Sequence, residues 1–153
     1  MTAVIQRVNN ATVFADGALA GKIEKGLYIL LGVKEGDSDE DAQLLAEKIS
    51  KLRIFSDENG KMNLSVIDID AEALVVSNFT LNANYQHGNR PDYFASASPD
   101  EANRLYMLFI SLLGQKIKNV EMGMFGADMR TEMSTDGPVT IVMESALLRR
   151  GKK

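Results

Sequence analysis

The chain has 153 residues, of which 45% are hydrophobic and 25% charged, and its formal net charge is −4. This length and composition are typical of one globular domain with a core of its own. The lack of cysteine excludes disulfides, thiolate zinc sites and a cysteine nucleophile. The negative net charge argues against a protein that coats nucleic acid in general, because phosphate binding usually requires a basic surface.

Strand-like segments dominate the start of the chain. Residues 3–8 and 11–15 are short runs of strand composition. The dipeptide Asp16-Gly17 is typical of a hairpin turn, because glycine accepts a positive φ at no steric cost. Residues 18–24 are then expected to form the returning strand of this hairpin.

A buried strand and a helix are expected next. The apolar run 27–33 indicates a strand that is buried on both faces. Ser38, followed three residues later by Asp41, is typical of a capping box at the start of a helix. The apolar side of this helix is expected to consist of Ala42, Leu45, Ile49 and Leu52.

The second half of the chain predicts one more helix between strands. Residues 73–76 form an apolar strand, and residues 82–97 are loop-like. A helix follows, with Ser98 as its cap, Pro99 at its first position and Gly114 at its end. The remaining expected strands are residues 120–123, 129–134 and 139–143.

Together these elements predict one mixed α/β domain over residues 1–153, with two main helices. The early hairpin favours antiparallel pairing, so we expect a largely antiparallel, barrel-like sheet. No repeat or linker divides the chain. The basic end of the chain favours a solvated tail, which we expect to be flexible from about residue 146 to 153.

The sequence also predicts a cytoplasmic protein without a membrane segment. Arg7 interrupts the first apolar run too early for a signal peptide. No stretch approaches the ~18 apolar residues that a transmembrane helix needs. Metal binding is not expected, because the chain has no cysteine and a single histidine, His87.

The segment 77–81, Ser-Asn-Phe-Thr-Leu, is the first candidate site because it directly follows an apolar strand. The strand fixes the geometry of such a segment while the segment itself stays accessible. Hydroxyl and backbone N–H groups at this point could hold a carbonyl or stabilise an oxyanion. Taken alone, the segment favours an ordinary strand end that contains a hydroxyl turn over a functional site.

Two further segments are candidates of a different kind. Residues 136–140, Asp-Gly-Pro-Val-Thr, contain a Gly-Pro pair that is usually only a turn. In residues 125–129, Phe125 and Met129 lie four positions apart and could sandwich a flat base. Core packing is the alternative for these two side chains.

These segments, with others, carry a family resemblance over roughly residues 1–145. In this order along the chain, the matching segments are residues 3–8, 26–32, 52–55, 60–63, 75–81, 125–129 and 136–140. Each segment is short, but coincidence is improbable for the whole series. The sequence resembles the D-aminoacyl-tRNA deacylase family.

The resemblance implies a homodimer with active sites at the subunit interface. It implies an esterase that removes D-amino acids, and glycine, from the 3′-terminal adenosine of tRNA without a cofactor. In the family the bond between Gly137 and Pro138 would be cis, and the pair would reach into the partner's site. The side chain of an L-amino acid would clash with the backbone carbonyls there, whereas a D-amino acid would not. Specificity would then come from steric exclusion of the L-amino acid.

The resemblance assigns roles to residues of the strand end as well. Ser77 and Phe79 would position the ester, and Thr80 would be a candidate nucleophile. Hydrolysis assisted by the 2′-hydroxyl of the tRNA is preferred, because the sequence places no base beside Thr80. Asn78 would contact substrate, although the family usually has glutamine at this position.

Three more residues receive roles from the resemblance. Phe125 and Met129 would hold the terminal adenine. Arg7 would brace the Gly-Pro segment through hydrogen bonds.

Two other functions stay open at the level of sequence. One is a non-catalytic nucleic-acid-binding module, against which the acidic balance counts. The other is a hydrolase of small esters that uses Ser77 or Thr80 with His87. The polar surroundings of His87 are more typical of an exposed loop than of a catalytic triad.

Overall fold

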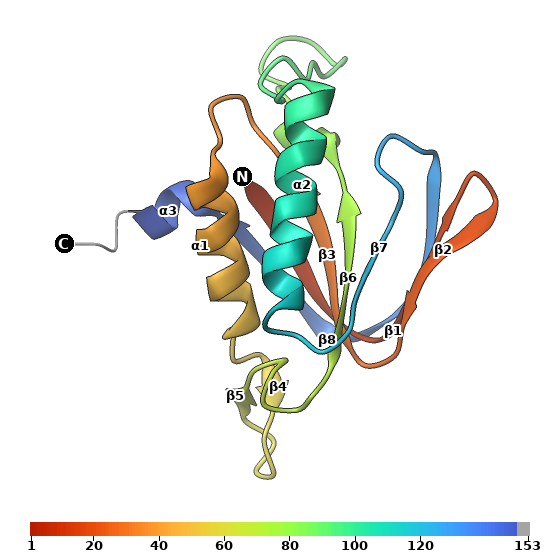
Figure 1. Ribbon diagram of the computed structural model, residues 1–153, viewed down its shortest axis with the longest axis vertical. Coiled ribbons are helices and arrows are strands. Elements are labelled where there is room, and N and C mark those ends of the chain that lie inside the picture. The colour runs from red at the N-terminus through yellow and green to blue at the C-terminus, as the bar shows by residue number, and fades with distance from the viewer. Residues whose placement is uncertain (150–153) are drawn as a thin grey trace.

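A computed structural model describes residues 1–149, which form one mixed α/β domain (Figure 1). The elements in chain order are β1 (Thr2–Ala15), β2 (Ala18–Ile23), β3 (Gly26–Gly32), α1 (Asp39–Ser50), β4 (Phe55–Ser56), β5 (Met62–Leu64), β6 (Glu72–Ser77), the 3-10 helix η1 (Phe79–Asn82), α2 (Pro99–Gly114), β7 (Val120–Met122), β8 (Met129–Glu144) and α3 (Ser145–Arg149).

The main sheet is built around the long strand β1. Its first half pairs antiparallel with β3 and its second half pairs antiparallel with β2, while β8 runs antiparallel along its other side. The two short strands that the sequence predicts here are therefore one strand. The exposed pair Asn9 and Asn10 lies where β1 leaves β3 and approaches β2, which explains the polar interruption in its pattern.

The sheet continues beyond β3 with parallel strands, in the order β2-β1-β3-β6-β7. It curls until Gly21 of β2 faces β7, and a Cβ atom on Gly21 would lie 2.9 Å from the carbonyl oxygen of Met122. Only a residue without a side chain permits this approach. The expected barrel-like, largely antiparallel sheet is thus confirmed, and the parallel pairs β3–β6 and β6–β7 are an addition to it.

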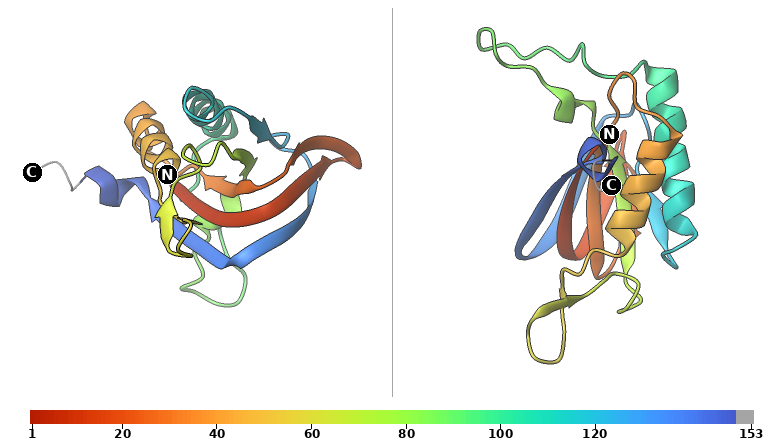
Figure 2. Two further views of the ribbon diagram at one scale, coloured as in Figure 1. Left: turned by 90° about the horizontal axis from the view of Figure 1, so that it is seen from below. Right: turned by 90° about the vertical axis from the view of Figure 1, so that its left-hand side faces the viewer.

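Helices α1 and α2 cover one face of the sheet (Figure 2). The core between these layers consists of fully buried side chains, including Leu27, Ile29, Leu45, Ile49, Leu105 and Phe109. The start of α1 is capped as predicted, because the Asp41 carboxylate accepts hydrogen bonds from the Ser38 backbone N–H at 2.8 Å and hydroxyl at 3.2 Å. The predicted start and end of α2, at Pro99 and Gly114, are also confirmed.

The C-terminal segment differs in part from the expected tail. Residues 145–149, most of which were expected to be flexible, form the short helix α3, in which Ser145 is buried. Arg149 forms an ion pair with Asp41 of α1, which ties this helix to the body. The last four residues lie outside the described part, so the expectation for 150–153 remains a prediction. Among the described residues, no helix is long and apolar enough to span a membrane.

Candidate active site

A cavity of about 470 Å³ lies where the parallel strands β3 and β6 end. Its lining comes from β3, from the end of β6, from the start of α2 and from the segment before β8. The lining residues are Leu31, Val33, Ser77, Asn78, Phe79, Ser96, Ala97, Pro99, Ala102, Tyr106, Phe125, Gly126, Ala127 and Met129. This volume is typical of small-ligand pockets, and the carboxyl ends of parallel strands are a common place for them.

The structure brings five of the predicted site residues together on this cavity. They are Ser77, Asn78, Phe79, Phe125 and Met129. The first three follow directly from β6, whose parallel register with β3 pairs Leu31 with Ser77. The Asn78 backbone N–H then donates to the Leu31 carbonyl at 2.8 Å, so the candidate segment starts from a fixed strand end.

One wall of the cavity depends on Tyr106 of α2, which the sequence did not single out. Its hydroxyl is buried and donates a hydrogen bond to the Val75 carbonyl at 2.9 Å. Burial raises the pKa of Tyr106, so the phenol stays neutral and acts as a donor. Its ring lies 6.0 Å from that of Phe125, so Tyr106 couples α2 and β6 to the predicted base-binding residue.

Met129 reaches the cavity across a glycine. A Cβ atom on Gly123 would lie 2.6 Å from the Met129 sulfur, so the thioether lies directly against the glycine backbone. A side chain at position 123 would displace Met129 from the place where it lines the cavity. The sequence placed Gly123 at a strand end and gave no signal for this packing role.

Thr80 lies on the exposed first turn of η1 and is not among the lining residues. The Asn78 side-chain oxygen accepts a hydrogen bond from the Thr80 backbone N–H at 3.2 Å and a second, short one from the Thr80 hydroxyl. Asn78 therefore caps η1 and orients Thr80. Asparagine suits this arrangement, because it is among the preferred capping residues.

No catalytic base adjoins Thr80 in the described part of the chain. Its hydroxyl bonds only to Asn78 there. His87 lies on the exposed loop and forms no hydrogen bond with Ser77 or Thr80 among residues 1–149. The pairing that a serine or threonine hydrolase needs between nucleophile and histidine is thus not formed in this arrangement.

Arg7, Gly137 and Pro138 lie apart from this cavity. Gly137 and Pro138 are exposed in a bulge of β8, where the register with β1 shifts opposite Arg7, and the peptide bond between them is cis. Arg7 Nε donates to the Asp136 carbonyl at 3.2 Å and pairs with the Asp136 carboxylate at 3.0 Å. Its Nη1 donates to the Ile54 carbonyl at 2.7 Å, so Arg7 links the bulge to the segment before β4.

The fold and the cavity define a barrel-like α/β protein with a ligand-sized pocket beside a polar strand end. The family model described as D-Tyr-tRNA(Tyr) deacylase matches residues 4–144. A D-aminoacyl-tRNA deacylase of Thermosipho africanus is 52% identical over 145 residues, which cover 95% of this chain and 97% of that protein. One of Persephonella marina is 51% identical over 148 residues, which cover 97% and 100%.

Solved structures agree with this relationship. The c-Myc DNA Unwinding Element Binding Protein matches with a TM-score of 0.88 and 37% identity, over 94% of this chain and 98% of that one. A probable eukaryotic D-amino acid tRNA deacylase matches with a TM-score of 0.79 over 94% and 100%, and its 13% identity supports the fold alone. The chain belongs to the D-aminoacyl-tRNA deacylase family of ester hydrolases, as its resemblance predicted.

Proposed function

We propose that this protein hydrolyses the ester between a D-amino acid, or glycine, and the 3′-terminal adenosine of tRNA, as a cytoplasmic homodimer. The main observation is that the segments 77–79 and 125–129 face one cavity, in a chain that belongs to the deacylase family. Phe125 and Met129 would hold the adenine, and the strand end at Ser77 would receive the ester. No cofactor is part of the proposal.

The location of Gly137 and Pro138 favours action across a dimer. Both are exposed and neither lines the cavity of its own chain. They also lie on β8, which pairs only with β1 among the described strands and so has a second edge available to another chain. In our proposal their carbonyls enter the partner's cavity and exclude L-amino acids by a steric and polar clash.

Hydrolysis would rely on positioning and on the substrate's own 2′-hydroxyl. The aminoacyl ester is already activated, so orientation and oxyanion stabilisation can supply much of the acceleration. The geometry at Thr80 supports this choice, because its hydroxyl proton is engaged by Asn78 and no base adjoins it in residues 1–149. Thr80 and Asn78 would then act as one positioning unit rather than as a nucleophile and a separate substrate contact.

The proposed reaction is tested with matched D-Tyr-tRNA and L-Tyr-tRNA. We expect the D-ester to be cleaved and the L-ester to remain. Equal cleavage of both, or cleavage of neither, rules out the proposed function. Hydrolysis of a simple aryl ester that is lost in the variant His87→Ala would instead support the small-ester hydrolase.

A double-mutant cycle tests the role of Thr80. We expect Thr80→Ala and Asn78→Ala each to lower kcat by about tenfold or less, and the double variant to lose little more than the worse single one, because hydrogen-bonded partners are not additive. Thr80→Ser, which keeps the hydroxyl, is the matched control. If Thr80→Ala abolishes hydrolysis while D-Tyr-tRNA still binds, threonine is the nucleophile.

DNA binding is the second candidate function. It is favoured by the likeness to the c-Myc DNA Unwinding Element Binding Protein and disfavoured by the net charge of −4. This function would be supported if the protein binds duplex DNA in a salt-dependent way and cleaves neither D-Tyr-tRNA nor L-Tyr-tRNA.

A further inference from the structure

The loop of residues 83–97 lies at the mouth of the cavity and carries exposed aromatic rings. Tyr85 is 78% exposed and Phe94 is 86% exposed, the two largest fractions among the exposed large hydrophobic side chains of residues 1–149. Phe79, at the cavity itself, is 59% exposed. The loop projects beyond the end of β6 and the start of α2, away from the body of the domain (Figures 1 and 2).

This loop is held in a defined shape by hydrogen bonds. Asn84 and Asp92 exchange two backbone hydrogen bonds of 2.9 Å, and the Asn84 side-chain amide donates to the Asp92 carboxylate at 3.1 Å. At its base, the Asn82 side-chain amide donates to the Val33 carbonyl at 2.9 Å. The loop can therefore present its side chains without a large ordering cost on binding.

An edge-to-face contact connects the loop to the candidate site. The ring of Tyr93 lies 5.1 Å from that of Phe79, with an angle of 78° between their planes. Phe94, the next residue in the chain, is exposed. A ring contact therefore connects the cavity wall at Phe79 to the loop that carries Tyr85 and Phe94.

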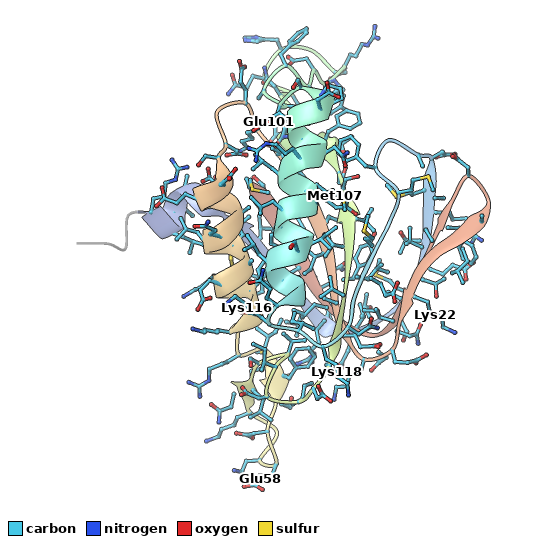
Figure 3. All side chains as sticks on the ribbon, viewed as in Figure 1. Lys22, Glu58, Glu101, Met107, Lys116 and Lys118 are labelled. Carbon is cyan, nitrogen blue, oxygen red and sulfur yellow. The ribbon has the colours of Figure 1, made fainter. Side chains whose placement is uncertain are left out.

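The loop also carries a cation that is available to a ligand. Arg90 is exposed and forms no ion pair with any residue of the described chain. By contrast, Lys116 and Lys118 lie toward the other end of α2, where Glu47 and Asp70 engage them (Figure 3). An unpaired guanidinium and exposed aromatic rings on one loop are the combination that binds single-stranded nucleic acid, because bases stack on the rings and phosphate pairs with the cation.

We propose that Tyr85, Phe94 and Arg90 bind the unpaired nucleotides that precede the terminal adenosine of the tRNA. This inference rests on the proposed function, which places that adenosine in the cavity. The strand must then leave through the mouth, where the loop presents its exposed rings. The loop thereby contributes to the affinity for tRNA and leaves the chemistry at Ser77 and Phe79 unchanged.

The test compares two substrates of different length with the double variant Tyr85→Ala/Phe94→Ala. With D-Tyr-tRNA we expect KM to rise about 10- to 100-fold at unchanged kcat, since each stacked base contributes about tenfold. With the D-tyrosyl ester of adenosine alone we expect no change. Leu19→Ala, which removes a 61% exposed side chain from β2, is the matched control.

Arg90→Gln separates phosphate pairing from stacking. We expect it to reduce the slope of log(kcat/KM) against log salt by about 0.7, the value for one phosphate of a single strand. An equal loss on both substrates in the double variant, or no loss on D-Tyr-tRNA, would overturn the proposal.

Direct binding distinguishes a failure of this proposal from a failure of the proposed function. Binding can be measured without hydrolysis by fluorescence anisotropy, with an oligoribonucleotide that ends in CCA and carries no amino acid. Weaker binding by the double variant supports the loop surface even if the wild-type protein cleaves neither ester. Unchanged binding overturns it even if the wild-type protein deacylates D-Tyr-tRNA.

Discussion

Gly137→Ala is expected to reduce kcat/KM for D-Tyr-tRNA by at least about 100-fold while the protein stays folded. Gly137 has φ +134°, a backbone conformation that residues with a side chain rarely adopt. A Cβ atom there would lie 2.7 Å from the Val139 nitrogen and 2.9 Å from Val139 Cγ2. The Gly-Pro carbonyls would shift, and a displacement of about 1 Å at a reacting centre is enough for this loss.

The variant should lose some stability, because alanine at this positive φ is strained, but the loss should be limited because Gly137 itself is exposed. Gly36→Ala is the matched control, since Gly36 also has a positive φ, +83°, but a Cβ atom on it would meet no atom within 4 Å, and it has no place in the proposed site. Kinetics and thermal unfolding are measured on both variants. A Gly137→Ala protein with normal activity and normal discrimination between D- and L-esters would exclude Gly137 from the chiral filter.

Mixed dimers test whether the filter works across subunits. Gly137→Ala is combined with Ala102→Trp, which fills the cavity of its own chain. We suppose that each Gly137 serves the partner's cavity. Every mixed dimer then contains one intact site, because the open cavity of the Gly137→Ala subunit receives the unchanged bulge of the Ala102→Trp subunit. Activity should then reappear on mixing and refolding two inactive proteins. Continued inactivity of verified mixed dimers would place the Gly-Pro pair outside the partner's site.

Local features of the sequence predicted most elements correctly, because their signals lie within a few residues. Ser38 with Asp41 and Ser98 with Pro99 marked the helix starts, since caps act on the turn that follows. The apolar run before Ser77 likewise predicted β6 and its polar end. The five residues that meet on the cavity were linked by the family resemblance, since no local pattern connects positions 77–79 with 125 and 129.

Features that depend on distant contacts could not be predicted. The parallel pairing of β6 with β3 and β7 involves segments far apart in sequence. An apolar run indicates a buried strand but does not identify the strands that pair with it. Tyr106 was missed because its hydroxyl bonds to Val75, which a helical pattern cannot reveal. The dual hydrogen bond from Thr80 to Asn78 was also not anticipated, although asparagine is a common cap.

Gly26→Ala is expected to lower the free energy of unfolding by about 3 kcal/mol or more, the upper range for overpacking of a tight interior. Gly26 is buried at the start of β3 and pairs with Glu72 of β6. A Cβ atom there would lie 2.0 Å from the Glu72 carbonyl oxygen and 2.7 Å from its carbonyl carbon. Both are backbone atoms in a sheet, so a change of side-chain rotamer cannot relieve the clash.

Urea unfolding at one protein concentration measures this effect against the control Gly114→Ala. Gly114 ends α2, and a Cβ atom on it would meet no atom within 4 Å, so alanine should leave stability unchanged or raise it slightly. Gly26→Ala should also lose activity, because the same β3–β6 register pairs Leu31 with Ser77 at the cavity. Unchanged stability in Gly26→Ala would mean that β3 and β6 can separate at Glu72 at no cost, which would contradict the close approach of the two strands there.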